Sequence, residues 1–289
     1  MWTKKETAMA KVLVIGATGY LGSHMVRELK RAGHWVRALS RREGAFATAT
    51  YKPDDTFIGE ATRSETLGGL CDGIEYVFSA LGQTRQRDKL NVWDVDYAAN
   101  KTVLDLAVAA GVRQFLFISV VRPELSIDLD IVAAREALVV DMARSGIAHT
   151  VVRATGFFSD MDEVLEMARG GRVWLLGTGR SQINPVDGAD VALAAIATFG
   201  TNIVEIEIGG PDIFSYEEIG ALAFDVLGSR PRITHLPQWI VNAGLAALRC
   251  FDRRKYTTFA FLARMMQNDI IAPRTGTRHL RDAFRSAVG

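Results

Sequence analysis

Three glycines near the start of the chain have the spacing of a phosphate-binding turn. Gly16, Gly19 and Gly22 follow the β-branched run 11–15, and a segment with helical periodicity opens at Tyr20. The first glycine permits a tight turn, the second lets a pyrophosphate approach the backbone, and the third lets the helix pack closely on the strand. The helix start adds N–H groups and a partial positive charge. We therefore predict a dinucleotide site, with a purely structural turn as the alternative, formed by Gly16, Thr18, Gly19, Tyr20, Leu21 and Gly22.

The residues after the second predicted strand, 35–39, bear on which dinucleotide binds. Proteins that bind NAD place an Asp or Glu about 20 residues beyond the first glycine, where it binds the ribose hydroxyls. This chain has Ser40, Arg41 and Arg42 there. Because the arginine fork matches a phosphate group, the sequence predicts NADP(H), with Arg41 and Arg42 near the 2′-phosphate. A solvated charged loop is the alternative.

A sheet must position these residues, and the N-terminal half of the chain predicts one. Strands are expected at 56–58, 76–80, 114–119 and 149–153, alternating with helical patterns at 64–70, 94–110 and 130–144. This alternation predicts an α/β protein with a Rossmann-type, doubly wound parallel sheet.

The same sheet predicts where the nicotinamide end of the cofactor lies. Ligands of open α/β sheets bind outside the carboxyl ends of the strands. We expect the loop 83–89 to face the cofactor or the substrate. For Phe157 and Phe158, packing in the core is the alternative to a cofactor contact. The predicted cofactor contacts at this end are Gly82, Ser119, Arg135, Thr155, Gly156, Phe157 and Phe158.

The alternation changes beyond Arg153. A helix near 163–168, a strand at 173–176, a helix at 189–199, a strand at 204–208 and a helix around 216–226 are expected. We predict an NADP-binding domain at 11–155 and a smaller substrate-binding lobe, mainly 156–289, interleaved with it without a linker. The apolar segment 237–266 is expected to be a helix pair packed on the core. Contact with a membrane surface, or a cavity for a bulky apolar substrate, are the alternatives.

Composition excludes several classes of partner. The chain has 289 residues and a net charge of +1, which gives no basis for a nucleic-acid partner. Two cysteines and five scattered histidines give neither a disulfide framework nor metal-ligand spacing, and a reducing cytoplasm is the expected compartment. No apolar run suits a transmembrane span, and the polar first ten residues do not read as a secretory signal. The oligomeric state stays open.

Several motifs together resemble a known family. GATGYLG at 16–22, VRALSRR, FLFIS, SGIAHTVVRATGFF and NPVDGADVA resemble the NmrA-like branch of the atypical short-chain dehydrogenase/reductases. GFFSDM, IEIGGP, YEEIG and HLRDAF are similar to segments of the divinyl chlorophyllide 8-vinyl reductase type. The resemblance runs from about residue 11 to 284. It implies an NADP-dependent protein with a C-terminal lobe over the nicotinamide.

The chain departs from the wider family at three positions. Extended short-chain reductases carry a Ser after strand five and a Tyr-x-x-x-Lys on the next helix, and here the matching residues are Val121, Ile131 and Arg135. Without a phenol, no evident acid can protonate a carbonyl oxygen, which disfavours an alcohol dehydrogenase. Arg135 keeps a positive charge that can bind a ribose hydroxyl or a developing anion. An ordinary exposed helix residue is the alternative.

Three functions therefore stay open. One is an NADPH-dependent reductase acting on a bulky, apolar, conjugated small molecule. A second is a non-catalytic NADP(H)-binding redox sensor that regulates a partner. The third, an isomerase or dehydratase with retained cofactor, is disfavoured because it also needs a Tyr-like acid/base. We favour the reductase, because a sensor of the cofactor alone does not need a large apolar lobe.

Overall fold

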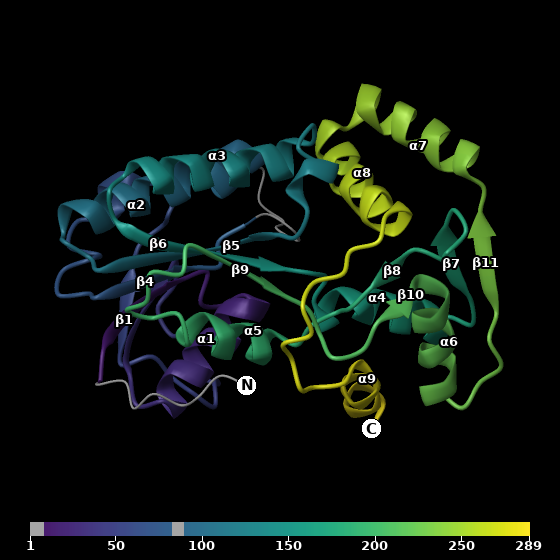
Figure 1. Ribbon diagram of the computed structural model, residues 1–289, viewed down its shortest axis with the longest axis horizontal. Coiled ribbons are helices and arrows are strands. Elements are labelled where there is room, and N and C mark those ends of the chain that lie inside the picture. The colour runs from purple at the N-terminus through teal and green to yellow at the C-terminus, as the bar shows by residue number, and fades with distance from the viewer. Residues whose placement is uncertain (1–8, 83–89) are drawn as a thin grey trace. The chain divides into compact units, whose positions relative to one another are not determined.

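The computed structural model describes residues 9–82 and 90–289, so the predicted loop 83–89 lies outside the described residues. Seven parallel strands form one sheet in the order β3-β2-β1-β4-β5-β6-β9 (Figure 1). The chain winds outward from β1 in one direction and then from β4 in the other, which is the predicted doubly wound, Rossmann-type fold. The strands are β1 Lys11–Ile15, β2 Trp35–Ser40, β3 Asp55–Ile58, β4 Tyr76–Ser79, β5 Gln114–Val120, β6 Ala148–Ala154 and β9 Glu205–Ile208.

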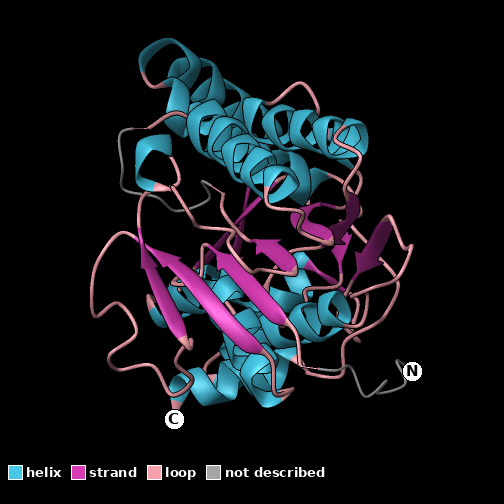
Figure 2. Cartoon of the chain, turned by 90° about the vertical axis from the view of Figure 1, so that its left-hand side faces the viewer, coloured by secondary structure: helices cyan, strands magenta, loops and turns pink. Residues whose placement is uncertain are grey.

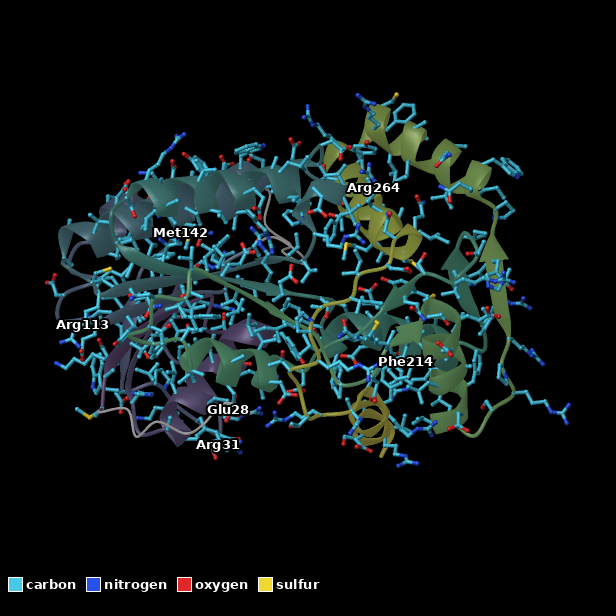
Figure 3. All side chains as sticks on the ribbon, in the orientation of Figure 1. Glu28, Arg31, Arg113, Met142, Phe214 and Arg264 are labelled. Atoms are coloured by element: carbon cyan, nitrogen blue, oxygen red, sulfur yellow. The ribbon has the colours of Figure 1, made fainter. Side chains whose placement is uncertain are left out.

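Helices cover both faces of this sheet (Figure 2). In Figure 1, α2 Asn100–Ala109 and α3 Asp130–Arg144 lie on one face, and α1 Tyr20–Arg31 lies on the other. Met142 of α3 points towards the sheet and is fully buried (Figure 3). Nearly every residue of β5 is buried, as expected for a strand covered on both faces. In the same view, α5 Gly188–Ile196 lies on the same side of the sheet as α1 (Figure 1).

Three predicted helices differ from the observed ones. The segment 64–70 forms only a short 3₁₀ helix, Ser64–Thr66, because two glycines follow and Gly69 has a φ of +78°. The predicted helix 94–110 begins with a π-helix, η2 Trp93–Ala99, before α2. The helix expected near 163–168 already begins at Phe158, where the Asp160 carboxylate accepts a hydrogen bond from the Phe157 N–H.

The chain divides into two compact units. Unit 1 contains the described residues of Met1–Ser119 together with Asp130–Arg153 and Val191–Ile206, and unit 2 contains Val120–Leu129, Ala154–Asp190 and Glu207–Gly289. The division into an NADP-binding domain at 11–155 and a substrate-binding lobe at 156–289 stays a prediction. These ranges differ from the compact units at 120–129, which belongs to unit 2, and at 191–206, which belongs to unit 1 because β9 returns to the large sheet and extends its edge beside β6.

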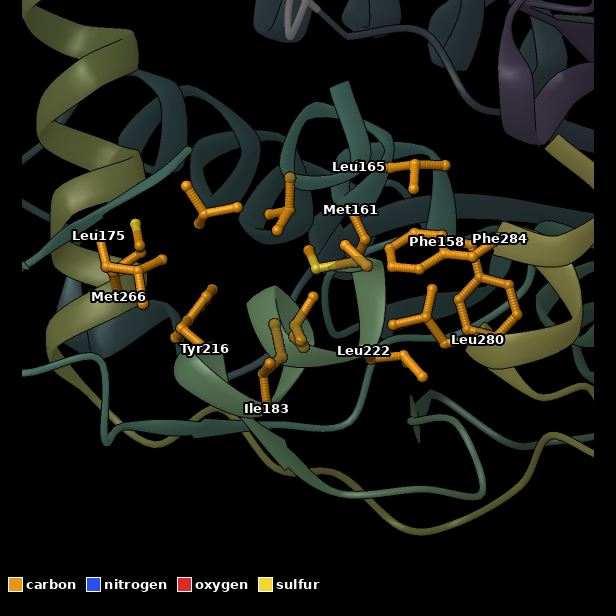
Figure 4. Close-up of a cluster of buried hydrophobic side chains, with 14 of the residues drawn as sticks. Phe158, Met161, Leu165, Leu175, Ile183, Tyr216, Leu222, Met266, Leu280 and Phe284 are labelled. Carbon is orange, nitrogen blue, oxygen red and sulfur yellow. The ribbon is translucent and has the colours of Figure 1, made fainter. Parts of the chain in front are cut away.

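Unit 2 is built around small sheets and its own core. β8 pairs with β10 and β7 pairs with β11. Phe158, Met161, Leu222, Leu280 and Phe284 belong to a cluster of buried apolar side chains (Figure 4). The elements are α4 Phe158–Arg169, β7 Val173–Leu176, β8 Gln182–Ile183, β10 Phe214–Ser215, α6 Tyr216–Val226, β11 Ile233–Leu236, α7 Gln238–Phe251, α8 Arg253–Gln267 and α9 Leu280–Val288.

The NPVDGADVA motif has a structural role within unit 2. Asn184 is fully buried, and its amide donates to the carbonyls of Gly210 (3.1 Å) and Ala272 (2.9 Å). Its Oδ1 accepts from the Ala272 N–H at 3.1 Å. Asp190 accepts from the backbone N–H groups of Thr277 (2.9 Å) and Arg278 (3.1 Å). The motif therefore ties the extended segment 272–278 to the rest of the unit.

The apolar segment 237–266 forms α7 and most of α8. Helix α8 buries Thr257, Ala260, Ala263 and Met266. Helix α7 buries Val241 alone. The predicted packing on the core therefore holds for α8 and is wrong for α7. Within residues 9–82 and 90–289, no helix is both long and apolar enough to cross a membrane.

Candidate cofactor site

The glycine turn after β1 has the geometry that its spacing predicts. Gly16 has a φ of +74°, and a methyl group there would lie 2.9 Å from the carbonyl of Ala80. A methyl group at Gly22 would overlap the carbonyl of Gly16. The Gly19 N–H donates to the Gly16 oxygen at 2.9 Å and closes the turn. The roles predicted for Gly16 in the turn and for Gly22 in close packing are therefore confirmed.

The start of α1 is suited to an anion. Gly19 precedes the helix in an extended conformation, and a methyl group there would lie 3.2 Å from the Gly16 oxygen, with no other described atom beyond its chain neighbours within 4 Å. Among the described residues, no side chain caps α1 and none of the acidic ones lies in its first turn. Thr18 and Gly19 are exposed. A pyrophosphate fits here, because it would accept hydrogen bonds from the N–H groups of the first turn and interact with the helix dipole.

The end of β2 lies at the same edge of the sheet. β1 and β2 are parallel neighbours, with Val14 opposite Ala38. The Ser40 hydroxyl donates to the Arg42 carbonyl at 2.9 Å and accepts from the Arg42 N–H at 3.2 Å, which fixes a turn directly after the strand. Arg41 and Arg42 are both exposed in this turn. The structure thus brings the predicted phosphate-binding arginines to the strand edge that carries the glycine turn.

Arg135 is held by a buried carboxylate. Its Nε donates to Asp96 Oδ1 at 2.8 Å; the Asp96 side chain is fully buried and that of Arg135 is 11% exposed. The two terminal nitrogens of Arg135 hydrogen-bond to no residue in the described part of the chain. A methyl group at Gly82 would overlap one of them. Gly82 and Arg135 are therefore brought together after β4, and the alternative that Arg135 is an ordinary exposed residue is wrong.

A buried asparagine that we did not predict fixes this arrangement. The Ser79 hydroxyl donates to Asn100 Oδ1 at 2.5 Å. The Asn100 amide donates to the carbonyls of Leu81 (3.2 Å), Val95 (3.1 Å) and Asp96 (3.0 Å). Asn100 thus joins the end of β4 to the helix that carries Asp96. The one sequence signal is an asparagine inside a helical pattern, where its propensity is poor.

Ser119 supports an ion-pair network. Its hydroxyl donates to Glu136 Oε1 at 2.7 Å, and the Arg153 guanidinium donates to both oxygens of Glu136, at 2.8 and 2.9 Å. Arg153 Nε also donates to Glu205 at 2.7 Å. Burial alone would lower the pKa of Arg153, but its hydrogen bonds to the two glutamates outweigh this effect and raise it. A cofactor contact of Ser119 stays a prediction.

The other predicted positions lie in unit 2, described here by itself. Thr155 is buried and donates to the Asn184 carbonyl at 2.6 Å. A methyl group at Gly156 would lie 3.0 Å from Ile183, and Phe157 is half-buried. The Phe158 ring is buried in the core cluster of unit 2, in agreement with the packing alternative. Cofactor contacts at these four residues stay a prediction.

Two triad-equivalent positions are apolar and buried. Val121 in unit 2 is 1% exposed and Ile131 in unit 1 is 3% exposed. Neither side chain can donate or accept a proton. Within the described residues, no group of three or more His, Cys, Asp or Glu side chains is placed to hold a metal ion.

A doubly wound sheet whose first strand runs into an uncapped glycine turn is typical of dinucleotide-binding proteins. A family model described as NAD(P)H-binding matches residues 16–201, more than half of the chain. The chain belongs to this NAD(P)H-binding family. The resemblance seen in the motifs is confirmed to this extent: the chain is homologous to divinyl chlorophyllide 8-vinyl reductases, and its structural neighbours lie in the atypical short-chain dehydrogenase/reductase, NmrA-like class.

The chain is similar to proteins of two kinds. The chloroplastic divinyl chlorophyllide a 8-vinyl-reductase of Zea mays is 26% identical over 253 residues, which cover 80% of this chain and 63% of the maize protein. This chain thus spans less than two thirds of that relative. The photosystem II assembly factor Ycf39 of Synechocystis sp. is 24% identical over 269 residues, which cover 91% of this chain and 80% of the factor.

A solved structure shares the fold. The NADPH-dependent quinone oxidoreductase QOR2 of Escherichia coli aligns with a TM-score of 0.76 over 96% of this chain and 100% of its own. Its sequence is 17% identical, so the likeness concerns the fold alone. Together, the family and the fold are those of an NAD(P)H-binding, reductase-like protein.

Proposed function

We propose that this protein is an NADPH-dependent reductase of a bulky, apolar, conjugated small molecule. The observation that carries the proposal is Arg135. Its guanidinium is largely buried, is oriented by Asp96, and keeps two terminal nitrogens without a partner among the described residues. A positive group fixed at the end of β4 is placed to stabilise negative charge that develops on a bound substrate.

The residues present suit reduction of a carbon–carbon double bond better than carbonyl chemistry. NADPH bound along the glycine turn, with Arg41 at its 2′-phosphate, would supply a hydride. Val121 and Ile131 offer no proton for a carbonyl oxygen. In a conjugated substrate, the negative charge left by hydride addition to one carbon can spread towards Arg135, and a water molecule then supplies the proton to the other carbon. The same lack of a phenol disfavours an isomerase or dehydratase. The similarity to a vinyl reductase supports this choice of substrate class.

A redox sensor is the second candidate function. This chain covers 80% of the photosystem II assembly factor Ycf39 but 63% of the maize reductase, and Ycf39 is named as an assembly factor rather than a reductase. Such a protein would bind NADPH and NADP with different affinities or in different conformations, and no acceptor would oxidise the cofactor. Single-turnover oxidation of bound NADPH distinguishes the two functions. The acceptors are a quinone and a divinyl chlorophyllide, and a fall in the nicotinamide absorbance with either one supports the reductase.

Arg41→Ala is expected to weaken NADPH binding selectively. Losing a charge-assisted arginine–phosphate contact costs about 1.5 to 3 kcal/mol, or about ten- to a hundredfold in affinity. NADH lacks the 2′-phosphate, and so its affinity should change little. Titrations of both nucleotides into the wild type and the variant, followed by fluorescence or calorimetry, measure the difference.

Arg113→Ala provides the matched control. Arg113 is a surface arginine of the same unit, 70% exposed and paired with Glu75. Its loss should leave both affinities unchanged. If Arg41→Ala weakened the binding of NADPH and NADH equally, Arg41 would not contact the 2′-phosphate. The predicted preference for NADP(H) would then have no support from Arg41.

A further inference from the structure

Helix α7 presents an apolar face to solvent. Trp239 is 71% exposed and Phe251 is 90% exposed. Relative to Trp239, the exposed apolar side chains fall at spacings of 1, 4, 7, 8, 11 and 12, and so they lie along one side of an α-helix. This exposed face consists of Trp239, Ile240, Ala243, Ala246, Ala247, Cys250 and Phe251.

The opposite side of α7 packs against the protein. Val241 is buried, Leu245 and Leu248 are half-buried, and α7 packs against α8 (Figure 1). A narrow polar strip, Gln238, Asn242 and Arg249, separates the packed side from the exposed face. Helix α8 contacts the side of α7 that carries Val241, Leu245 and Leu248, and so α8 does not cover the exposed face.

The charge around this face is mainly positive. Residues 238–267 contain one acidic residue, Asp252, which caps α8 by accepting from the Lys255 N–H at 3.1 Å and also pairs with the Lys255 Nζ at 3.4 Å. Arg249, Arg253 and Lys255 are exposed at the end of α7 and the start of α8. The Arg249 guanidinium lies over the Tyr256 ring at 6.0 Å, at the edge of the helix. The surroundings therefore complement an anionic surface.

We infer that α7 binds the surface of an anionic lipid bilayer, with its exposed face in the boundary between headgroups and acyl chains. A helix with an apolar face and flanking cations gains from burying apolar area and from the attraction to anionic lipids. Trp239 and Phe251, near opposite ends of the helix, enter the boundary, while Arg249, Arg253 and Lys255 contact the headgroups. This contact is separate from the proposed reductase chemistry.

Vesicle flotation tests the inference without cofactor or substrate, so its outcome is independent of the proposed reaction. The full chain should float with phosphatidylcholine vesicles that contain roughly one-third phosphatidylglycerol, and less with phosphatidylcholine alone. Trp239→Ser/Phe251→Ser should weaken partitioning about a hundredfold or more, because each of the two large apolar side chains contributes about tenfold or more. Arg249→Gln/Lys255→Gln should reduce binding to the anionic vesicles only.

A matched pair of surface changes controls for general loss of apolar area. Ile58→Ser/Leu193→Ser removes two exposed apolar side chains outside α7 and should leave flotation unchanged. Because Trp239 and Phe251 are exposed, their variant should keep the wild-type melting temperature. The inference is overturned if the wild type does not float or if the α7 variant floats equally well. A shift of the α7 variant from dimer to monomer in mass photometry would also overturn it, since a second copy would then cover the face.

Discussion

Replacing Arg135 with methionine is expected to lower kcat by about 10²-fold or more, the scale seen when one preorganised donor to a developing negative charge is removed. The dissociation constant of NADPH should change little, because the glycine turn and Arg41 would hold the phosphates. Single-turnover oxidation of bound NADPH by the best acceptor, with a parallel titration of NADPH, separates the two quantities.

Two further readouts make this prediction specific. Methionine leaves the Asp96 carboxylate buried without its cation, so the unfolding of the variant must be measured alongside its rate. Arg135→Lys keeps the positive charge and should retain more of kcat than Arg135→Met. Weaker NADPH binding with a nearly intact kcat would instead identify Arg135 as a ribose anchor. If neither quantity changed, the catalytic role of Arg135 would be wrong.

Arg153→Met is expected to lower the free energy of unfolding by about 3 kcal/mol, the low end of the range for breaking a buried ion pair. The Arg153 side chain is 7% exposed and donates to both oxygens of Glu136. Methionine leaves that carboxylate desolvated and without its cation; among the described residues, only the Ser119 hydroxyl would still donate to it. Urea denaturation of the wild type and the variant measures the loss.

The same network supplies the controls. Arg113→Met removes an arginine from a surface pair and should cost no more than about 1 kcal/mol. Glu136→Gln/Arg153→Met removes the stranded charge and should recover much of the stability lost in the single variant. A loss for Arg153→Met no larger than that for Arg113→Met would show that the network contributes little.

The sequence predicted those parts of the fold that depend on local patterns. The helices α1 and α3 lie where their periodicity places them, because glycines or turns bound amphipathic segments. The roles of Gly16 and Gly22 were also predictable, since only glycine accepts that φ and that close approach.

The pairing of Asp96 with Arg135 was not predictable, because it joins two helices 39 residues apart in sequence. Asp96 also lies in a π-helix, whose i→i+5 hydrogen bonds change which residues turn inward relative to an α-helix. The Glu136–Arg153–Glu205 network likewise depends on tertiary packing of α3, β6 and β9. For α7, the apolar pattern indicates a helix with a buried side, but not whether the opposite side is covered.

The most direct test of the proposed reductase follows the hydride itself. NADPH deuterated at the reactive C4 position is bound to the protein, a conjugated apolar acceptor is added, and the product is analysed by mass spectrometry and NMR. We predict that the product of the wild-type reaction carries one deuterium on a carbon of the reduced double bond. Arg135→Met should transfer the deuterium to the same carbon at a much lower rate. Tight NADPH binding with no transfer of deuterium to any acceptor in the panel would contradict the reductase and favour the sensor.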